Sequence, residues 1–402
     1  MMNKSTRMIL VTGLARSGTT LLSECLDHHP QMMCIADPMN EFFKGFMRYA
    51  YYKVENERKN VGYPIDNFFF SGSKRVSQFI DETDLNHPIP DYLKAEILAR
   101  IALRDGEYCP EIIEPLKYCK ATTFDGLYLE ILQLLFDAYG EPGTLCYGIK
   151  TAWCEQLLKP LARTFPNMTF VNIIRDPRAV IASNYQDKGS RFPILFNIRD
   201  WRKSVYYDWK YQHSDPILEN RFVGVAYEDI LANPEMVLKK ITDLVGLEYS
   251  EEMIWRGFKQ PNSSYAVKSD TKGISSASKN KWMEILPKDI VLQTETYCGT
   301  EMEKLNYKKL FPDKAPDINS LTLMEDNTYE FLSEWCKELV QRKKYYENTW
   351  HIYNTYLETI RLVLLKDDIN CNNLSMIDDF FYDHKYFLWL RNNRPSEIGY
   401  AG

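Results

Sequence analysis

The chain has 402 residues, of which 45% are hydrophobic and 26% charged, and its formal net charge is −6. This composition is typical of a globular protein with a large core, and the negative charge argues against general binding of nucleic acid. No apolar run approaches the roughly 18 residues of a membrane span, and the first one, residues 8–11, is too short for a secretory signal. The nine cysteines form no C-x-x-C pair, and the six histidines show no zinc spacing. We therefore expect reduced thiols, a cytoplasmic protein and no metal site.

The first motif is the segment MILVTGLARSGTTLL at residues 8–22. An apolar strand pattern enters a turn at Gly13, the turn closes at Gly18, and a helical pattern begins at Thr19. A strand, a glycine-hinged loop and a helix N-terminus together form a cradle for phosphate. The spacing is that of a nucleoside triphosphatase loop in which Thr19 replaces the lysine that contacts the β- and γ-phosphates, so cleavage of a β–γ bond is disfavoured. Arg16 offers a forked cation inside the loop instead.

Strand and helix patterns alternate along the chain. We expect strands at 32–36, 145–149, 169–174 and 222–226, and helices at 19–27, 122–139, 157–164, 198–211, 234–245 and 288–306. This alternation predicts an α/β fold with a P-loop-like parallel sheet flanked by helices. We expect the α/β domain at residues 1–312 and a C-terminal helical extension at 313–402, which either caps its own core or joins two copies as a homodimer.

A second group of polar residues follows predicted strands. Arg175 follows the strand at 169–174, and Ser183 comes eight residues later on the next predicted helix. Ligands of open parallel sheets bind beyond the carboxyl ends of the strands, so these two side chains suit a second phosphate. The alternative is that Arg175 pairs structurally with Asp176. Asp37 places a carboxylate at the end of another strand.

The segments GLARSGTTLL and IIRDPRAVIAS resemble the two nucleotide-binding signatures of sulfotransferases, which use 3′-phosphoadenosine 5′-phosphosulfate (PAPS). YGIKT, AYEDILANPEMVLKKITDLVGL and SKNKWMEIL follow in the order that the family has. The resemblance covers about residues 8–307 and is closer to the bacterial and tyrosylprotein-type branch than to the steroid and phenol branch, which usually has lysine at the place of Arg16. It implies in-line transfer of a sulfuryl group from PAPS to a hydroxyl or amine, with a carboxylate base and without a metal.

The resemblance also implies roles for individual residues. The 5′-phosphosulfate is assigned to the loop residues Arg16, Ser17, Gly18, Thr19 and Thr20. The 3′-phosphate is assigned to Arg175 and Ser183, the adenine to Tyr227, and contact with the cofactor phosphates to Lys281. Lys150 is assigned to the transferring group, with support from Ser263 or Ser264.

The catalytic base is a departure from the family pattern, because many relatives have glutamate where this chain has Asp37. Glu41 follows one helical turn later. We favour Asp37 as the base and keep Glu41 as the alternative.

Two other functions are compatible with the loop. One is a P-loop kinase that uses ATP, and the other is a non-catalytic scaffold that binds nucleotide and assembles through its C-terminal helices. If the chain is a sulfotransferase, we favour a small molecule or a carbohydrate as acceptor over a peptide.

Overall fold

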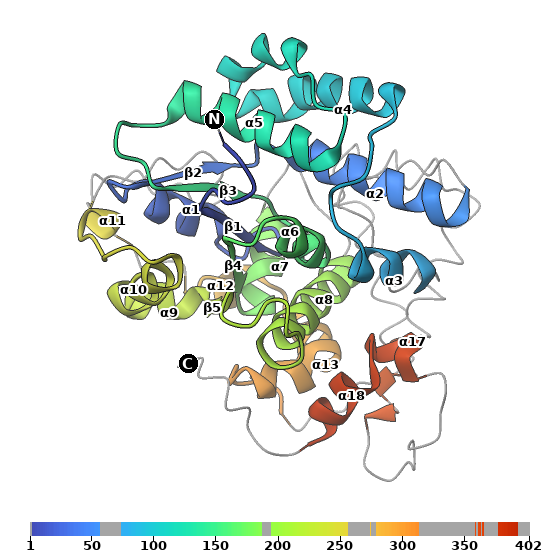
Figure 1. Ribbon diagram of the computed structural model, residues 1–402. Helices are drawn as coiled ribbons and strands as arrows, with labels where there is room; N and C mark the ends of the chain where they lie inside the picture. The colour runs from blue at the N-terminus through green and yellow to red at the C-terminus, as the bar shows by residue number, and fades with distance from the viewer. Residues whose placement is uncertain are drawn as a thin grey trace. The chain divides into compact units, whose positions relative to one another are not determined.

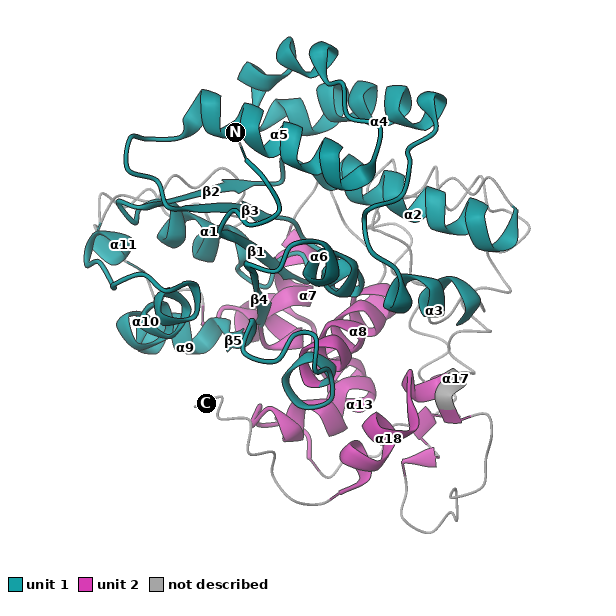
Figure 2. Cartoon of the chain, in the orientation of Figure 1, with its two compact units in different colours: residues 1–174, 210–262, 268–274 teal, residues 175–209, 263–267, 275–402 magenta. Residues whose placement is uncertain are grey.

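The computed structural model describes residues 2–56, 74–186, 194–255, 274, 279–312, 358, 361–362, 364–365 and 377–392. The chain divides into two compact units (Figure 2). Unit 1 comprises residues 1–174, 210–262 and 268–274, and unit 2 comprises residues 175–209, 263–267 and 275–402.

Unit 1 is built on a five-stranded parallel sheet with the strand order β2-β3-β1-β4-β5 (Figure 1). The strands are β1 (Met8–Gly13), β2 (Met32–Ala36), β3 (Cys146–Lys150), β4 (Met168–Ile174) and β5 (Phe222–Ala226). The predicted parallel sheet is confirmed, with β3 shifted by one residue and β4 longer by one. All strands are mostly buried, as expected for a parallel sheet with both faces covered.

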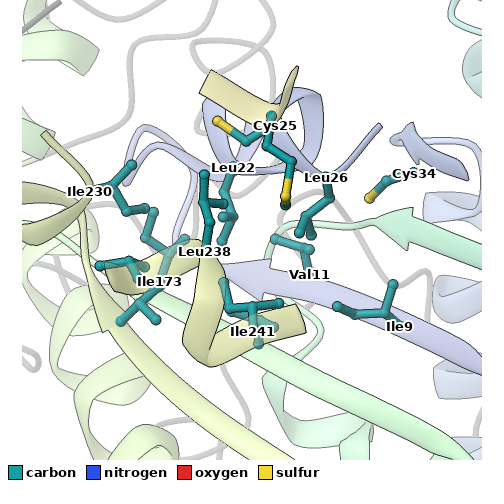
Figure 3. Close-up of a cluster of buried hydrophobic side chains, with 14 of the residues drawn as sticks. Ile9, Val11, Leu22, Cys25, Leu26, Cys34, Ile173, Ile230, Leu238 and Ile241 are labelled. Carbon is teal, nitrogen blue, oxygen red and sulfur yellow. The ribbon is translucent and has the colours of Figure 1, made fainter. Parts of the chain in front are cut away.

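One face of the sheet packs against α1 (Thr19–Asp27), α9 (Tyr227–Ala232), α10 (Pro234–Val245) and α11 (Glu252–Trp255). Alternate strand residues share a face, so Ile9 and Val11 both point into this layer. The helical side chains that meet them there include Leu22, Leu26, Ile230, Leu238 and Ile241 (Figure 3). Elsewhere in unit 1, α5 (Phe124–Tyr139) packs on β2 and α6 (Leu158–Thr164) packs on β4.

Three further helices of unit 1 follow β2 in sequence: α2 (Asn40–Glu55), α3 (Lys74–Glu82) and α4 (Asp91–Arg104). Short 3-10 turns follow α4 at Asp105–Glu107, Pro110–Ile112 and Pro115–Tyr118, and another precedes α6 at Glu155–Leu157. α2 packs against both α3 and α4. A Cβ at Gly45 would overlap the side chain of Ile97, so this glycine lets α2 and α4 approach closely.

Unit 2 contains α7 (Pro177–Gln186), residues 194–209 of α8 (Ile194–His213), α12 (Trp282–Ile285), α13 (Lys288–Lys304), α17 (Ile377–Phe381) and α18 (His384–Arg391). A buried ion network lies inside it. Arg202 donates to Glu301 at 3.1 Å and also to Glu358, while Arg361 donates to Glu301. Burial of a charge is tolerated only when it is paired, so this network fixes residues 358 and 361 to α8 and α13. Most of the predicted extension at 313–402 lies outside the described residues, and its boundary stays a prediction.

Gly18 provides a direct test of the turn between β1 and α1. Its φ is 101°, and an added Cβ would overlap the ring of Tyr227. Gly143 has the same backbone strain, with φ 100°, but nothing lies within 4 Å of its Cβ position. We expect Gly18→Ala to lower the free energy of unfolding by about 1–3 kcal/mol more than Gly143→Ala, because only the first adds a steric overlap. Urea denaturation of the two variants measures the difference, and equal losses would show that Tyr227 does not constrain the turn.

Candidate functional site

The loop between β1 and α1 has the geometry of an anion cradle. Gly13 has φ 143°, and a Cβ there would lie 2.5 Å from the carbonyl oxygen of Ile173, so only glycine fits. Arg16 also has a left-handed backbone, with φ 71°. The N–H and the hydroxyl of Ser17 both donate to the carbonyl of Leu14, at 3.1 and 2.6 Å. Gly18 occupies the N-cap of α1 and has no side chain to cap the helix, which leaves the first N–H groups suited to an anion.

Asp37 and Lys150 meet at the carboxyl ends of two neighbouring strands. β3 lies between β1 and β2, and Lys150 is in register with Val11 and Ala36. The N–H of Asp37 donates to the carbonyl of Lys150 at 2.7 Å, and the Lys150 ammonium donates to the Asp37 carboxylate. The side chain of Asp37 is 16% exposed and that of Lys150 4% exposed. A carboxylate that keeps some access to solvent is therefore held beside a buried cation.

The segment that follows β3 is bonded to the start of the anion loop. Thr151 donates its N–H to the carbonyl of Val11 at 2.9 Å, and Trp153 donates its N–H to the carbonyl of Gly13 at 3.0 Å. Trp153 has a left-handed backbone with φ 62°, an uncommon conformation for a bulky residue. These bonds fix the position of the Lys150 strand relative to the cradle.

Two tyrosines of unit 1 lie beside these groups. Tyr227 begins α9, directly after β5, and its ring lies against Gly18. Tyr108 is within electrostatic range of both Asp37 and Arg16: burial and the Asp37 charge raise the pKa of its phenol, and the Arg16 charge opposes them. The sequence analysis gave Tyr108 no role, because no motif surrounds it.

Glu41 lies in the first turn of α2 and is fully buried. Its carboxylate pairs with Lys44 at 2.8 Å, with Arg104 at 3.2 Å and with Arg100 at 3.9 Å. Burial raises the pKa of Glu41, but these cations outweigh the effect and the net pKa is lowered. The N–H of Glu41 donates to Asp105 at 2.9 Å. The pKa of Asp105 is raised to about 7, chiefly by burial and also by the charges of Glu41 and Asp37, against the opposing effects of the Glu41 N–H and of Lys44.

In unit 2, Arg175 and Ser183 are both buried. The carbonyl of Arg175 accepts a hydrogen bond from the indole of Trp201 on α8, at 2.8 Å, which fixes the backbone before α7. Ser183 lies on α7, as predicted. Ser263 and Ser264 lie outside the described residues.

Arg178 joins three segments of unit 2, and the sequence analysis missed it. Its guanidinium donates to Asp176 at 3.0 and 2.6 Å and to Glu295 of α13 at 2.6 Å. Burial lowers the pKa of Arg178, but the two carboxylates outweigh burial and raise it overall. The guanidinium also stacks 4.0 Å from the ring of Trp282, and Lys281 directly precedes that ring at the N-cap of α12. The predicted Lys281 is thereby placed near the start of α7.

Two searches of the described part of the chain were negative. No cluster of three or more His, Cys, Asp or Glu residues in that part could hold a metal ion. None of its helices is both long and apolar enough to cross a membrane.

The sequence model of the sulfotransferase family matches residues 8–251. This chain belongs to the sulfotransferase family. The match contains the anion loop, Asp37, Lys150, Arg175 and Tyr227, so the chain is a sulfuryl-transferring enzyme rather than an ATP-using kinase or a scaffold.

Individual sulfotransferases are similar to this chain. A putative protein-tyrosine sulfotransferase of Caenorhabditis briggsae is 22% identical over 260 residues, which cover 63% of this chain and 70% of that protein. Carbohydrate sulfotransferase 3 of Tetronarce californica is 28% identical over 212 residues, which cover 45% of this chain and 46% of that protein. The solved sulfotransferase domain of the Synechococcus PCC 7002 olefin synthase aligns with 74% of this chain and 96% of its own, at 18% identity and a TM-score of 0.42.

The raised pKa of Asp105 makes the stability of this sulfotransferase depend on pH. Between about pH 4 and pH 7 the folded chain retains a proton that the unfolded chain has released, so stability falls as the pH rises through this window. We expect Asp105→Asn to remove this fall, because the amide oxygen still accepts the Glu41 N–H but carries no charge.

The free energy of unfolding of Asp105→Asn should exceed that of the unchanged chain by an amount that grows from near zero at pH 4 to at most about 4 kcal/mol at pH 8. The upper limit follows from about 1.36 kcal/mol per unit of pKa shift. Urea denaturation at the two pH values measures it. Asp91→Asn, which changes an exposed carboxylate at the start of α4, is the control. A gain that does not change with pH would contradict the assignment.

Proposed function

We propose that this sulfotransferase uses PAPS as sulfuryl donor and a hydroxyl or amine of a small molecule or carbohydrate as acceptor. The observation that supports it most is the Asp37–Lys150 pair, which joins a partly exposed carboxylate to a cation. Lys150 ends β3, which pairs with β1, the strand from which the anion loop leaves, and Asp37 directly follows β2 on the other side of β3. A base, a cation and an anion cradle are the three groups that sulfuryl transfer requires.

The anion loop suits the 5′-phosphosulfate, with Arg16, Ser17, Gly18, Thr19 and Thr20 as its ligands. The support is the bare N-cap of α1 and the two glycine positions that bring main-chain N–H groups to the anion. Following the family resemblance, we assign the 3′-phosphate to Arg175 and Ser183, the adenine to Tyr227, and further phosphate contacts to Lys281 and Ser263. The contact of Tyr227 with Gly18 supports its part of this assignment.

The reaction is a displacement at sulfur. The acceptor oxygen gives its proton to Asp37 and forms a bond to sulfur, while the bond from sulfur to the 5′-phosphate oxygen breaks. Negative charge grows on the leaving phosphate, and Arg16, Lys150 and the loop N–H groups stabilise it. The products are a sulfate ester and adenosine 3′,5′-bisphosphate, and Asp37 returns its proton to solvent. Binding both substrates in line supplies the rest of the rate enhancement.

Asp37 suits the role of base better than Glu41. Three cations surround the Glu41 carboxylate and lower its pKa, which makes it a weaker base. Glu41 is also completely buried, whereas Asp37 keeps part of its surface open.

The acceptor and the cellular setting of the enzyme are part of the same proposal. The relatives named above include both protein-tyrosine and carbohydrate sulfotransferases. We propose that the acceptor is a small molecule or a carbohydrate. We also propose a cytoplasmic setting, which the odd number of cysteines, nine, supports. A homodimer through the C-terminal helices is part of this proposal.

Substitution of each carboxylate tests the base. We expect Asp37→Asn to lower kcat by about 10²–10⁴-fold, the range of general base catalysis, with unchanged affinity for adenosine 3′,5′-bisphosphate. Glu41→Gln should lower kcat less than tenfold at equal folded fraction. Labelled PAPS with a panel of hydroxyl acceptors gives kcat, and calorimetry gives the affinity. If Glu41→Gln lost as much activity as Asp37→Asn, the roles would be reversed.

Arg175→Ala tests the 3′-phosphate assignment. We expect it to abolish transfer and to weaken PAPS binding by about 100-fold, since a charged hydrogen-bonded pair contributes about 1.5–3 kcal/mol. Binding of adenosine 5′-phosphosulfate, which lacks the 3′-phosphate, should not change. Arg75→Ala, an exposed arginine on α3, is the matched control. Normal affinity of Arg175→Ala for PAPS would refute the assignment.

A further inference from the structure

A group of charged side chains lies between α2 and α4, both in unit 1. We call its four cations the cationic cluster: Lys44 and Arg48 from α2, and Arg100 and Arg104 from α4. The close approach of these helices at Gly45 brings the two pairs together. The proposed function uses none of the four.

The carboxylates that pair with the cluster are fewer than its cations. Glu41 pairs with Lys44, Arg104 and Arg100, and Glu96 pairs with Arg100 at 2.8 Å and with Arg48 at 3.8 Å. Two carboxylates of the described residues thus pair with the four cations. Asp105, beside Glu41, adds only part of a further negative charge at neutral pH, because its pKa is about 7.

Arg48 is the member with the least satisfied side chain. The residue is 8% exposed, and none of its three guanidinium nitrogens has a hydrogen-bond partner among the described residues. The Glu96 oxygen at 3.8 Å is beyond hydrogen-bond distance. A buried guanidinium without acceptors is costly, so its presence calls for an explanation. An oxyanion in the cluster would supply the acceptors that the described residues do not give Arg48.

We propose that the cationic cluster binds an oxyanion, a carboxylate or a sulfate, carried by the sulfuryl acceptor. The proposal rests on the proposed function, because it takes Asp37 as the base. Arg48 lies eight residues after Asn40, the first residue of α2, or about 12 Å along the axis of that helix, and Asp37 lies three residues before Asn40. The acceptor is then an acidic molecule whose reacting hydroxyl and oxyanion are on the order of 12 Å apart, the span of a short acidic oligosaccharide. Arg100 and Arg104 are partly exposed and provide the open side of the site.

The direct test measures binding of labelled inorganic sulfate by equilibrium dialysis to the full chain saturated with adenosine 3′,5′-bisphosphate. We expect one sulfate per chain that competes with neither phosphate of the nucleotide. Arg104→Gln, Arg100→Gln and Arg48→Met should each weaken it at least tenfold, and the matched control Arg75→Gln should leave it unchanged. Absence of such a sulfate, or binding in the Arg48→Met and Arg104→Gln variants as tight as in the unchanged chain, would overturn the proposal.

Thermal unfolding without sulfate separates a ligand-binding Arg48 from a structural one. Arg48→Met removes a buried charge that has only a long ion pair, with Glu96 at 3.8 Å, and nearly keeps the side-chain length, so we expect a higher melting temperature than that of the unchanged chain. A lower melting temperature would make Arg48 part of the fold and refute its role in binding.

Acceptors that differ only in their negative charge test whether the cationic cluster contributes to turnover. With labelled PAPS, disaccharides that contain a uronic acid should react at least tenfold faster in kcat/KM than their methyl esters, and Arg104→Gln should remove this preference. Esters that react as well as the free acids, or a preference found only for acidic peptides, would contradict the proposal. Calorimetry with adenosine 3′,5′-bisphosphate keeps the two hypotheses apart. Absence of that binding in the unchanged chain would count against the proposed function, whereas its loss only in the Arg48→Met, Arg100→Gln or Arg104→Gln variants would count against a separate site in the cluster.

Discussion

Lys150 is the residue on which the carboxyl edge of the sheet depends. Its carbonyl accepts the N–H of Asp37, its ammonium pairs with the Asp37 carboxylate, and the next residue, Thr151, is bonded to β1. All three contacts follow from one topological fact, that β3 lies between β1 and β2. The end of a single buried strand therefore sets the distance between the proposed base and the anion loop. A shift of β3 would move both groups, so the chemistry is coupled to the packing of the sheet.

Charge is handled differently in two parts of the molecule. In unit 2 the guanidinium of Arg178 has two carboxylates and an aromatic ring as partners, which is the arrangement of a structural cation. In unit 1 the guanidinium of Arg48 is buried, and no described residue accepts a hydrogen bond from it. A buried guanidinium without acceptors lowers the stability of the unliganded protein. Such a group is tolerated where a bound ligand supplies the acceptors, because ligand binding then stabilises the folded chain.

The sequence contained enough information for the sheet but not for all of the site. Apolar runs that end in Gly13, Asp37 and Arg175 were recognisable because buried parallel strands lack the alternation of half-exposed ones. The Arg48–Arg104 neighbourhood was not recognisable, because the two residues are far apart in sequence and meet only through the contact at Gly45. Asp105 and Tyr108 were missed for a similar reason: they lie in turns without a motif, and their properties come from burial and neighbouring charges. Tertiary packing, rather than local pattern, determines them.

The stacking of Trp282 on Arg178 has a consequence for observing the enzyme at work. An indole held under a cation and shielded from water differs in emission from one in solvent, and Lys281, the residue assigned to the cofactor phosphates, directly precedes it. Trp282 is one of eight tryptophans, so a variant that keeps only this indole would report changes beside the proposed cofactor ligand without an attached dye.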